Sequence, residues 1–102
     1  MVMSNLPTLS GKESIVLDLL AERGEMYGLE LVATSDSRLK RGTVYVTLGR
    51  MEDKGYVESW QEERHPGAIG LPRRLYRATP LGLRVRDAWA LLRQKLAFEG
   101  SR

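Results

Sequence analysis

The sequence contains no cysteine and a single histidine, His65. Without cysteine there is no disulfide framework and no thiolate-bound zinc site, and one imidazole cannot supply a His-rich metal site. No apolar run approaches the roughly 18 residues of a membrane span, and the N-terminus lacks the basic-then-apolar layout of a signal peptide. We therefore expect no metal, no cofactor, no membrane partner and a cytoplasmic location.

The composition is that of one small globular domain. The chain has 102 residues, of which 42% are apolar and 28% charged, with 16 Lys and Arg against 13 Asp and Glu. Basic residues gather at 38–41 and again at 73–77, where they suit contacts to phosphate groups. A solvated surface with scattered cations would give the same net charge of +3. Charge alone therefore leaves nucleic-acid binding open.

Apolar spacing predicts three helices in the first half of the chain. Ser10 and Glu13 form a capping box, and the helix that it begins should run from 11 to 23. A second helix is expected over 27–35 and a third over about 42–55. The inner stripe of the third helix is Val44, Leu48 and Met51, which leaves on its other faces Thr43, Tyr45, Thr47 and Arg50.

The second half changes to alternating polar and apolar residues. This pattern predicts a strand over 56–62, a loop over 64–72 and a returning strand over 73–78, which together make a β-hairpin. Thr79 and Pro80 are typical first residues of a helix, and this last helix should reach about Ala97. Trp60 is expected to pack within the hairpin.

Three helices, a two-stranded wing and a last helix define the predicted fold class, which is mainly α with a small β-hairpin. In this winged helix-turn-helix, the helix after the turn lies in the major groove of DNA. The residues expected to contact DNA are Lys40, Arg41, Thr43, Tyr45, Thr47 and Arg50 from the helix and Arg64, His65, Arg73 and Arg74 from the wing.

Three segments of the sequence resemble the PadR family of bacterial transcriptional regulators. Residues 27–31 (YGLEL) look like the family's YGYEI, and residues 42–57 (GTVYVTLGRMEDKGYV) look like its GTLYPLLHRLEEEGLL. Residues 76–82 (YRATPLG) are similar to its YRLTEKG element. Val46 stands where the family often has proline, and Lys40 and Arg41 are more basic than the family pattern.

The resemblance implies a homodimer that represses transcription by binding double-stranded DNA and releases it when a small molecule binds. The chain then divides into a flexible arm over 1–8, a winged-helix domain over 9–79, a dimerisation helix over 80–99 and a tail over 100–102.

Several residues allow two interpretations. Tyr45 either bonds to a phosphate or packs under the wing, and Thr43 either contacts DNA or caps its helix. Arg41 suits a phosphate or a guanine. Arg50 is either a DNA contact or an exposed helix arginine. His65 is either a pH switch or a solvated wing residue.

The last helix carries an apolar stripe that also has two explanations. It either packs on the first helix of the same chain or forms a dimer seam. In a seam, two Trp89 indoles could hold a small planar aromatic ligand between them. The residues of this stripe are Val85, Trp89, Leu92 and Leu96.

A winged-helix module that binds a protein rather than DNA is the alternative function, because fold does not fix function. No arrangement of residues supports catalysis, and no glycine-rich phosphate loop follows a strand. We therefore predict that the chain is not an enzyme.

Overall fold

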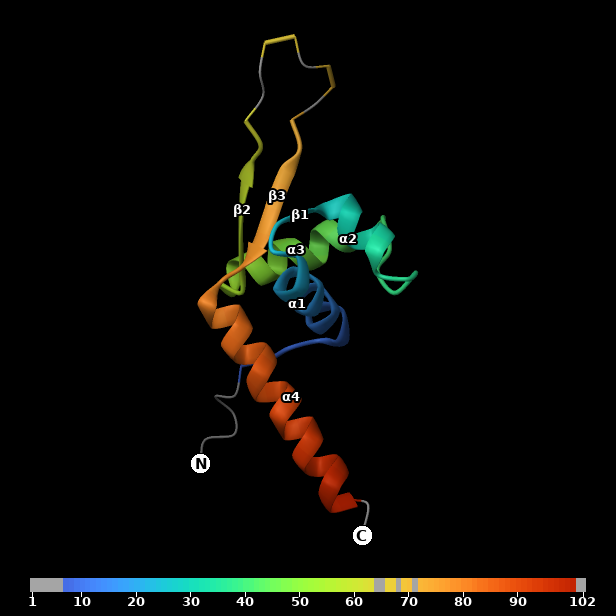
Figure 1. Cartoon of the computed structure of the whole chain (residues 1–102), viewed down its shortest axis with the longest axis vertical. Coiled ribbons are helices and arrows are strands. Elements are labelled where there is room, and N and C mark those ends of the chain that lie inside the picture. The colour runs from blue at the N-terminus through green and yellow to red at the C-terminus, as the bar shows by residue number, and fades with distance from the viewer. Residues whose placement is uncertain (1–6, 64–65, 68, 71, 101–102) are drawn as a thin grey trace.

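The computed structural model describes residues 7–63, 66–67, 69–70 and 72–100. Residues 1–6 of the predicted arm, Arg64 and His65 of the predicted interface, and the last two residues of the tail lie outside this range. Figure 1 shows a helical body from which the hairpin projects at one end and the last helix at the other. The elements are α1 (Gly11–Arg23), β1 (Met26–Tyr27), α2 (Gly28–Thr34), α3 (Val44–Asp53), β2 (Val57–Gln61), β3 (Arg74–Ala78) and α4 (Pro80–Gly100).

The predicted helices are present, with changes at their ends. The bounds of α1 are as predicted and its capping box is formed, with the N–H of Glu13 donating to Ser10 Oγ at 3.1 Å. Helix α3 is shorter than predicted at both ends. It begins at Val44, after a turn over residues 41–43, and it ends at Asp53, two residues before Gly55, which has a φ of 80°. Thr79 caps α4 as predicted, accepting the N–H of Gly82 at 3.0 Å, and α4 continues to Gly100.

The sheet has three strands rather than the predicted two. All pairings are antiparallel in the order β1-β3-β2, and Tyr27 of β1 is opposite Leu75. A strand of two residues is too short to show alternation in the sequence, so β1 could not be predicted. Its consequence is that Tyr27 lies beside the base of the wing.

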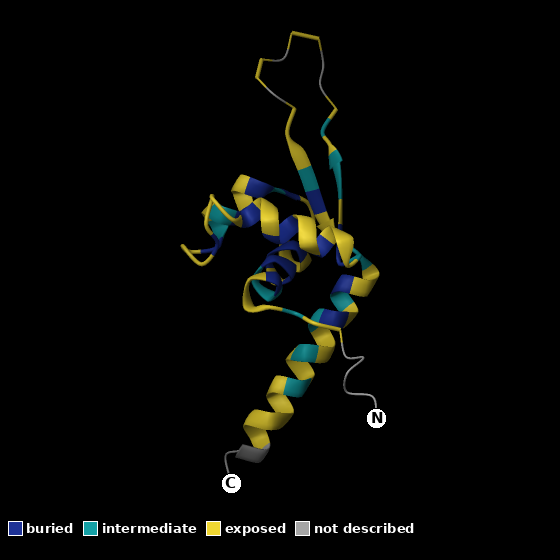
Figure 2. Cartoon of the chain, turned by 180° about the vertical axis from the view of Figure 1, so that it is seen from behind, coloured by how far each residue is buried: buried dark blue, intermediate teal, exposed yellow. Residues whose placement is uncertain are grey.

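The core lies where α1, α2 and α3 meet the base of the sheet. Figure 2 shows the buried residues concentrated there, whereas the wing and most of the far half of α4 are exposed. Every buried polar side-chain atom in the described part has a hydrogen-bond partner. The largest fully buried side chains belong to five leucines and one methionine, and three valines follow them in size. The six largest are Leu17, Leu20, Leu31, Leu39, Leu48 and Met51.

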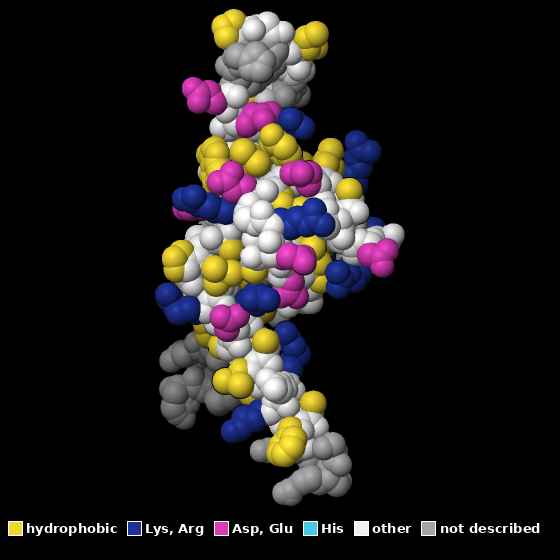
Figure 3. All heavy atoms as spheres, in the orientation of Figure 1, with side chains coloured by type: hydrophobic (Ala, Val, Ile, Leu, Met, Phe, Trp, Pro, Cys, Tyr) yellow, Lys and Arg dark blue, Asp and Glu magenta, His cyan; other side chains and the backbone are white. Residues whose placement is uncertain are grey.

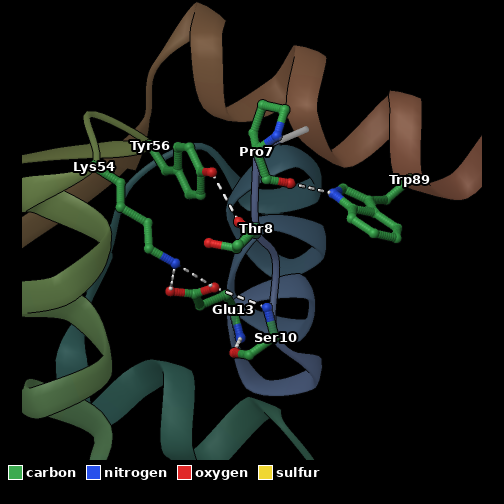
Figure 4. Close-up of polar contacts among 7 residues, drawn as sticks. All are labelled: Pro7, Thr8, Ser10, Glu13, Lys54, Tyr56 and Trp89. Atoms are coloured by element: carbon green, nitrogen blue, oxygen red, sulfur yellow. Dashed lines mark hydrogen bonds and ion pairs between the residues drawn. The ribbon is translucent and has the colours of Figure 1, made fainter. Parts of the chain in front are cut away.

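A buried carboxylate joins α1 to the end of α3. Glu13 is 3% exposed and accepts both the N–H of Ser10 at 2.8 Å and the ammonium of Lys54, at 3.0 and 2.8 Å (Figure 4). Burial alone would raise the pKa of Glu13, but these hydrogen bonds outweigh burial and hold the pKa below its usual value. The carboxylate therefore stays charged and fixes the end of α3.

Two aromatic side chains hold the segment that precedes α1. Tyr56 donates its hydroxyl hydrogen to the carbonyl of Thr8 at 2.8 Å, and the indole N–H of Trp89 donates to the carbonyl of Pro7 at 2.8 Å (Figure 4). Residues 7 and 8, which the sequence assigned to the arm, are therefore attached to the body.

Helix α4 divides into a packed half and an exposed half. Val85 is 5% exposed and belongs to the core of its own chain, and Trp89 is partly buried against that core. This placement corrects the expectation that Val85 lies in a dimer seam. Beyond Trp89 the helix projects away from the body (Figure 1), with Leu91 and Leu96 exposed by 62% and 61%. The wing and α4 project at opposite ends, and the molecule is 62 Å long.

Within the described residues, no helix combines the length and the apolar character needed to cross a membrane.

Gly82 allows α4 to begin against the turn after α3. A Cβ at this position would overlap the Tyr56 carbonyl oxygen and lie 3.0 Å from the carbonyl carbon and 3.1 Å from the Cα. Because backbone atoms cannot move aside as a side chain can, no residue larger than glycine fits there.

We predict that Gly82→Ala lowers the free energy of unfolding by about 2–4 kcal/mol, since overpacking forces backbone shifts. Gly49→Ala is the matched control, because a Cβ there meets nothing within 4 Å. It should raise stability by about 0.5–1 kcal/mol, the usual gain of alanine over glycine in a helix. Urea denaturation of both variants would measure this, and equal stabilities would contradict the predicted close contact.

Candidate nucleic-acid interface

The turn between α2 and α3 is held by a buried serine. Ser35 is 0% exposed, and its hydroxyl donates to the carbonyl of Val32 and accepts the N–H of Leu39, both at 2.9 Å. Asp36 and Ser37 follow at φ values of 57° and 68°, a left-handed conformation that short polar residues tolerate best after glycine. The turn is therefore fixed, and it sets the position of the basic residues that follow.

Lys40 and Arg41 are exposed at the corner before α3. Neither makes an ion pair within the part of the chain that the structure describes, and the nearby guanidinium of Arg38 donates only to the carbonyl of Ser35 at 2.9 Å. Thr43 precedes α3, and its side chain makes no capping hydrogen bond. The helix does not use this hydroxyl, which leaves it open to a partner.

Thr47 does not lie on the exposed face of α3. Its side chain is 8% exposed and lies among the buried residues Val44, Leu48 and Met51. The prediction had placed it on another face, because a threonine reads as polar in a pattern of apolar spacing. The structure removes Thr47 from the candidate interface.

The exposed face of α3 has two flanks. Tyr45, half exposed, borders a cleft beneath the wing, while Arg50 borders a hollow beside Trp89. Between these flanks lie Gly49 and Val46, of which Val46 is 56% exposed. The sequence did not single out Val46, because an apolar residue in a helix is usually assigned to the core.

Tyr45 rests against the backbone of α2. A Cβ on Gly28 would lie 2.6 Å from the Tyr45 ring, so only glycine lets the ring lie there. The hydroxyl oxygen of Tyr45 also lies close to Gly28, 2.7 Å from the position that a Cβ would take there. Of the two interpretations of Tyr45, packing is thus realised against α2, and the half-exposed ring can still meet a partner.

The cations of the wing, in contrast, are engaged locally. Arg73 pairs with Glu62 at 3.0 Å, and Arg77 pairs with Glu58 and lies over the ring of Trp60 at 5.2 Å. Arg74 donates to the hydroxyl of Ser59 at 2.9 Å. Figure 3 shows basic and acidic side chains mixed over this face of the body. Among the described cations of the predicted interface, Lys40, Arg41 and Arg50 are therefore the ones that make neither an ion pair nor a side-chain hydrogen bond within the described residues.

Sequence reasoning missed the contacts at the base of the wing. Tyr27 donates its hydroxyl hydrogen to Glu62 at 2.6 Å, although the two residues are 35 positions apart. Glu62 was overlooked because an acidic residue does not suggest a nucleic-acid interface. No periodicity connects such distant residues, so only the sheet order brings them together.

Three helices, a fixed turn, a following wing and exposed cations before the third helix define a winged helix-turn-helix, a class of DNA-binding fold. The chain belongs to the transcriptional regulator PadR-like family, whose model matches residues 16–88. It is accordingly a transcriptional regulator and not an enzyme.

Solved structures of this family share the fold. A PadR family regulator from Eggerthella lenta is 28% identical, with a TM-score of 0.65 over 86% of this chain and 77% of that one. One from Clostridium difficile is 27% identical, with a TM-score of 0.61 over 86% and 88%. Bacillus subtilis PadR in complex with operator DNA is 17% identical, with a TM-score of 0.67 over 93% and 62%. Among curated proteins, none matches this chain in sequence.

Proposed function

We propose that the chain is a DNA-binding repressor that acts as a homodimer and places α3 in the major groove. The observation that carries this proposal is the corner before α3, where Lys40 and Arg41 are exposed without an ion pair within the described residues. Cations of this kind attract phosphates, whereas the paired arginines of the wing would first have to leave their carboxylates. Bacillus subtilis PadR, which shares this fold, is solved in complex with operator DNA, and this supports DNA as the partner.

Each part of the interface has a role in this proposal. Lys40 and Arg41 contact phosphates beside the major groove. At the start of α3, Thr43 and Tyr45 form hydrogen bonds to the sugar-phosphate backbone of the DNA. Val46 faces the base edges, where an apolar side chain can meet a thymine methyl group. Arg74 approaches the backbone from the wing. A repressor needs no further chemistry, because occupying a promoter is enough.

Neutralising the corner should abolish most of this binding. We predict that Lys40→Gln with Arg41→Gln lowers affinity for the chain's own upstream DNA and reduces the slope of log K against log salt by about 2, one for each lost phosphate contact. Fluorescence anisotropy at several salt concentrations measures both quantities.

Lys12→Gln with Arg23→Gln is the control, since it removes the same charge from exposed positions of α1. If both pairs weaken binding equally, only net charge matters and α3 has no special role. If the unmodified protein binds no duplex at low salt, the chain is a protein-binding module instead.

The far half of α4 supplies the dimer contact in this proposal. Leu92 and Leu96 continue the stripe of Val85 and Trp89, but neither belongs to the core that the described residues form. Leu92 is partly buried, and Leu96 is 61% exposed. Helical spacing keeps these residues on one side of α4. A second copy that pairs through the same surface would bury both leucines, as an isologous interface requires.

A charge in this stripe should separate the two copies. Leu96→Glu is predicted to raise the dimer dissociation constant at least tenfold, because burying an unpaired carboxylate is costly. Sedimentation equilibrium measures this constant. Gln94→Glu is the control, since it adds the same charge on the opposite side of the helix and should leave the constant unchanged. Dissociation by both variants, or by neither, would contradict the proposed seam.

A small planar aromatic ligand would bind beside Trp89. The indole borders a hollow of about 440 Å³ that also contains Arg50 and Lys54, and a second, apolar hollow of about 240 Å³ on the Pro7 and Val85 side. Arg50 belongs to α3, so a ligand there would touch the helix that we place in the groove. Lys54 is paired with Glu13, which also lines this hollow, so Arg50 is the cation that would receive the carboxylate of an aromatic acid.

Calorimetry with 2-naphthoate tests this site, with cyclohexanecarboxylate as a non-planar anion of equal charge. We predict that naphthoate binds, that Trp89→Leu weakens it at least tenfold, and that Trp60→Phe leaves it unchanged, since stacking requires the indole of α4. Equal binding of the two acids, or an unchanged affinity in Trp89→Leu, would eliminate the stacking site.

A further inference from the structure

Three side chains meet where the wing leaves the body, one from each strand region. The carboxylate of Glu62, next to β2, accepts the hydroxyl of Tyr27 at 2.6 Å and the guanidinium of Arg73 at 3.0 Å. The guanidinium also lies 4.0 Å above the ring of Tyr27. We call this group, Tyr27 with Glu62 and Arg73, the wing latch. It joins β1, which leads into α2, to both arms of the wing.

The latch continues the pairing of the sheet beyond its last regular residues. The N–H of Glu62 donates to the carbonyl of Arg73 at 2.8 Å. The hydrogen bond from Tyr27 holds the pKa of Glu62 below its usual value, with help from Arg73, and the same bond raises the pKa of Tyr27. The carboxylate is thus ionised at neutral pH and bound by two different donors.

The latch also forms one wall of the cleft beside α3. This cleft has a volume of about 490 Å³ and lies between Tyr27, Arg73 and Arg74 on one side and Tyr45 on the other. In the proposed mode of binding, the DNA backbone between major groove and wing passes this cleft. The position of the latch therefore sets the distance between the helix and the wing.

An acidic residue at this place has a cost. Glu62 lies on a surface that would approach phosphates, so its charge opposes binding. Exposed ion pairs also contribute little to folding stability, and the side chain of Arg73 is 64% exposed. Neither electrostatic attraction nor stability explains a carboxylate here, whereas orientation of the wing does.

We propose that Glu62 is a positioning residue, which with Tyr27 and Arg73 fixes the wing relative to α3 so that both contact DNA at once. This inference rests on the proposed DNA-binding function. A fixed wing costs no ordering entropy when it binds its operator. Non-specific binding depends on charge and tolerates a loose wing. Glu62 should therefore improve selectivity while it weakens overall attraction.

The test separates these two effects with three variants. Glu62→Gln removes the charge and one acceptor oxygen, and Tyr27→Phe removes only the hydroxyl and keeps the ring under Arg73. Glu63→Gln is the matched control, because Glu63 is exposed and has the same charge, and no partner is recorded for it within the described residues. Circular dichroism confirms that each variant folds.

The DNA probes are a duplex enriched from a random pool by the unmodified protein and a scrambled duplex of equal composition. We expect Glu62→Gln and Tyr27→Phe to lower the ratio of the two affinities by about threefold to tenfold, the effect of one lost hydrogen bond. Glu63→Gln should raise both affinities and leave their ratio unchanged. If Glu62→Gln behaves as Glu63→Gln does, the latch has no positioning role.

Amide hydrogen exchange of the free protein keeps this result separate from the proposed function. In Tyr27→Phe, the Glu62 N–H should exchange at least threefold faster, while the amides paired between Glu58 and Arg77 stay unchanged. Unchanged exchange at Glu62 would overturn the latch whatever the DNA results. If the unmodified protein enriches no sequence, the proposed function fails, and exchange alone decides whether Glu62 orders the wing.

Discussion

The buried carboxylate of Glu13 is the contact on which the placement of α3 depends. One oxygen caps α1 through Ser10, and both receive the ammonium of Lys54 directly after α3. A carboxylate in this position must be paired, since an unpaired buried charge costs several kcal/mol. The same carboxylate therefore serves both elements, since it completes the capping box of α1 and holds Lys54 at the end of α3. The axis of α3 is therefore fixed at its C-terminal end by charge.

The other end of α3 is fixed without charge. The buried hydroxyl of Ser35 orders the turn, and the close contact of Tyr45 with Gly28 sets the distance to α2. Because these contacts are neutral, Lys40 and Arg41 are not needed to hold the start of α3 in place. Their charges are therefore available to a partner. The wing differs, since its arginines are paired within the hairpin. The molecule therefore separates Lys40 and Arg41, which have no ion pair within the described residues, from Arg73 and Arg77, which are paired in the hairpin.

The helices and the hairpin could be predicted because each has a local signal. The capping box at Ser10, the left-handed glycine at position 55 and the Thr79 cap each involve residues within a few positions of one another. Contacts between distant residues could not be predicted in this way. The pairing of Tyr27 with Glu62 depends on the two-residue strand β1, and no pattern of the sequence shows that strand.

The candidate site was predicted less well than the fold, for a related reason. The spacing of Val44, Leu48 and Met51 gave the correct inner face of α3, but the width of that face depends on what packs against it. The polar Thr47 is buried and the apolar Val46 is exposed, which is the reverse of what their polarity predicts. The stripe on α4 was likewise continuous in sequence, while only its first half meets the body. Periodicity predicts a direction on a helix and not how far along the helix the neighbouring elements extend.

The length of α4 has a mechanical consequence. A helix of 21 residues measures about 30 Å, and here one end is attached to the body while the other projects away from it (Figure 1). If two copies cross at the free end, each body becomes the moving end of a lever. A rotation of about 10° at the crossing would then displace α3 by about 5 Å, a sizeable fraction of the 34 Å between successive major grooves. A small change in packing between two leucines would thus be amplified into a mismatch with the spacing of the grooves.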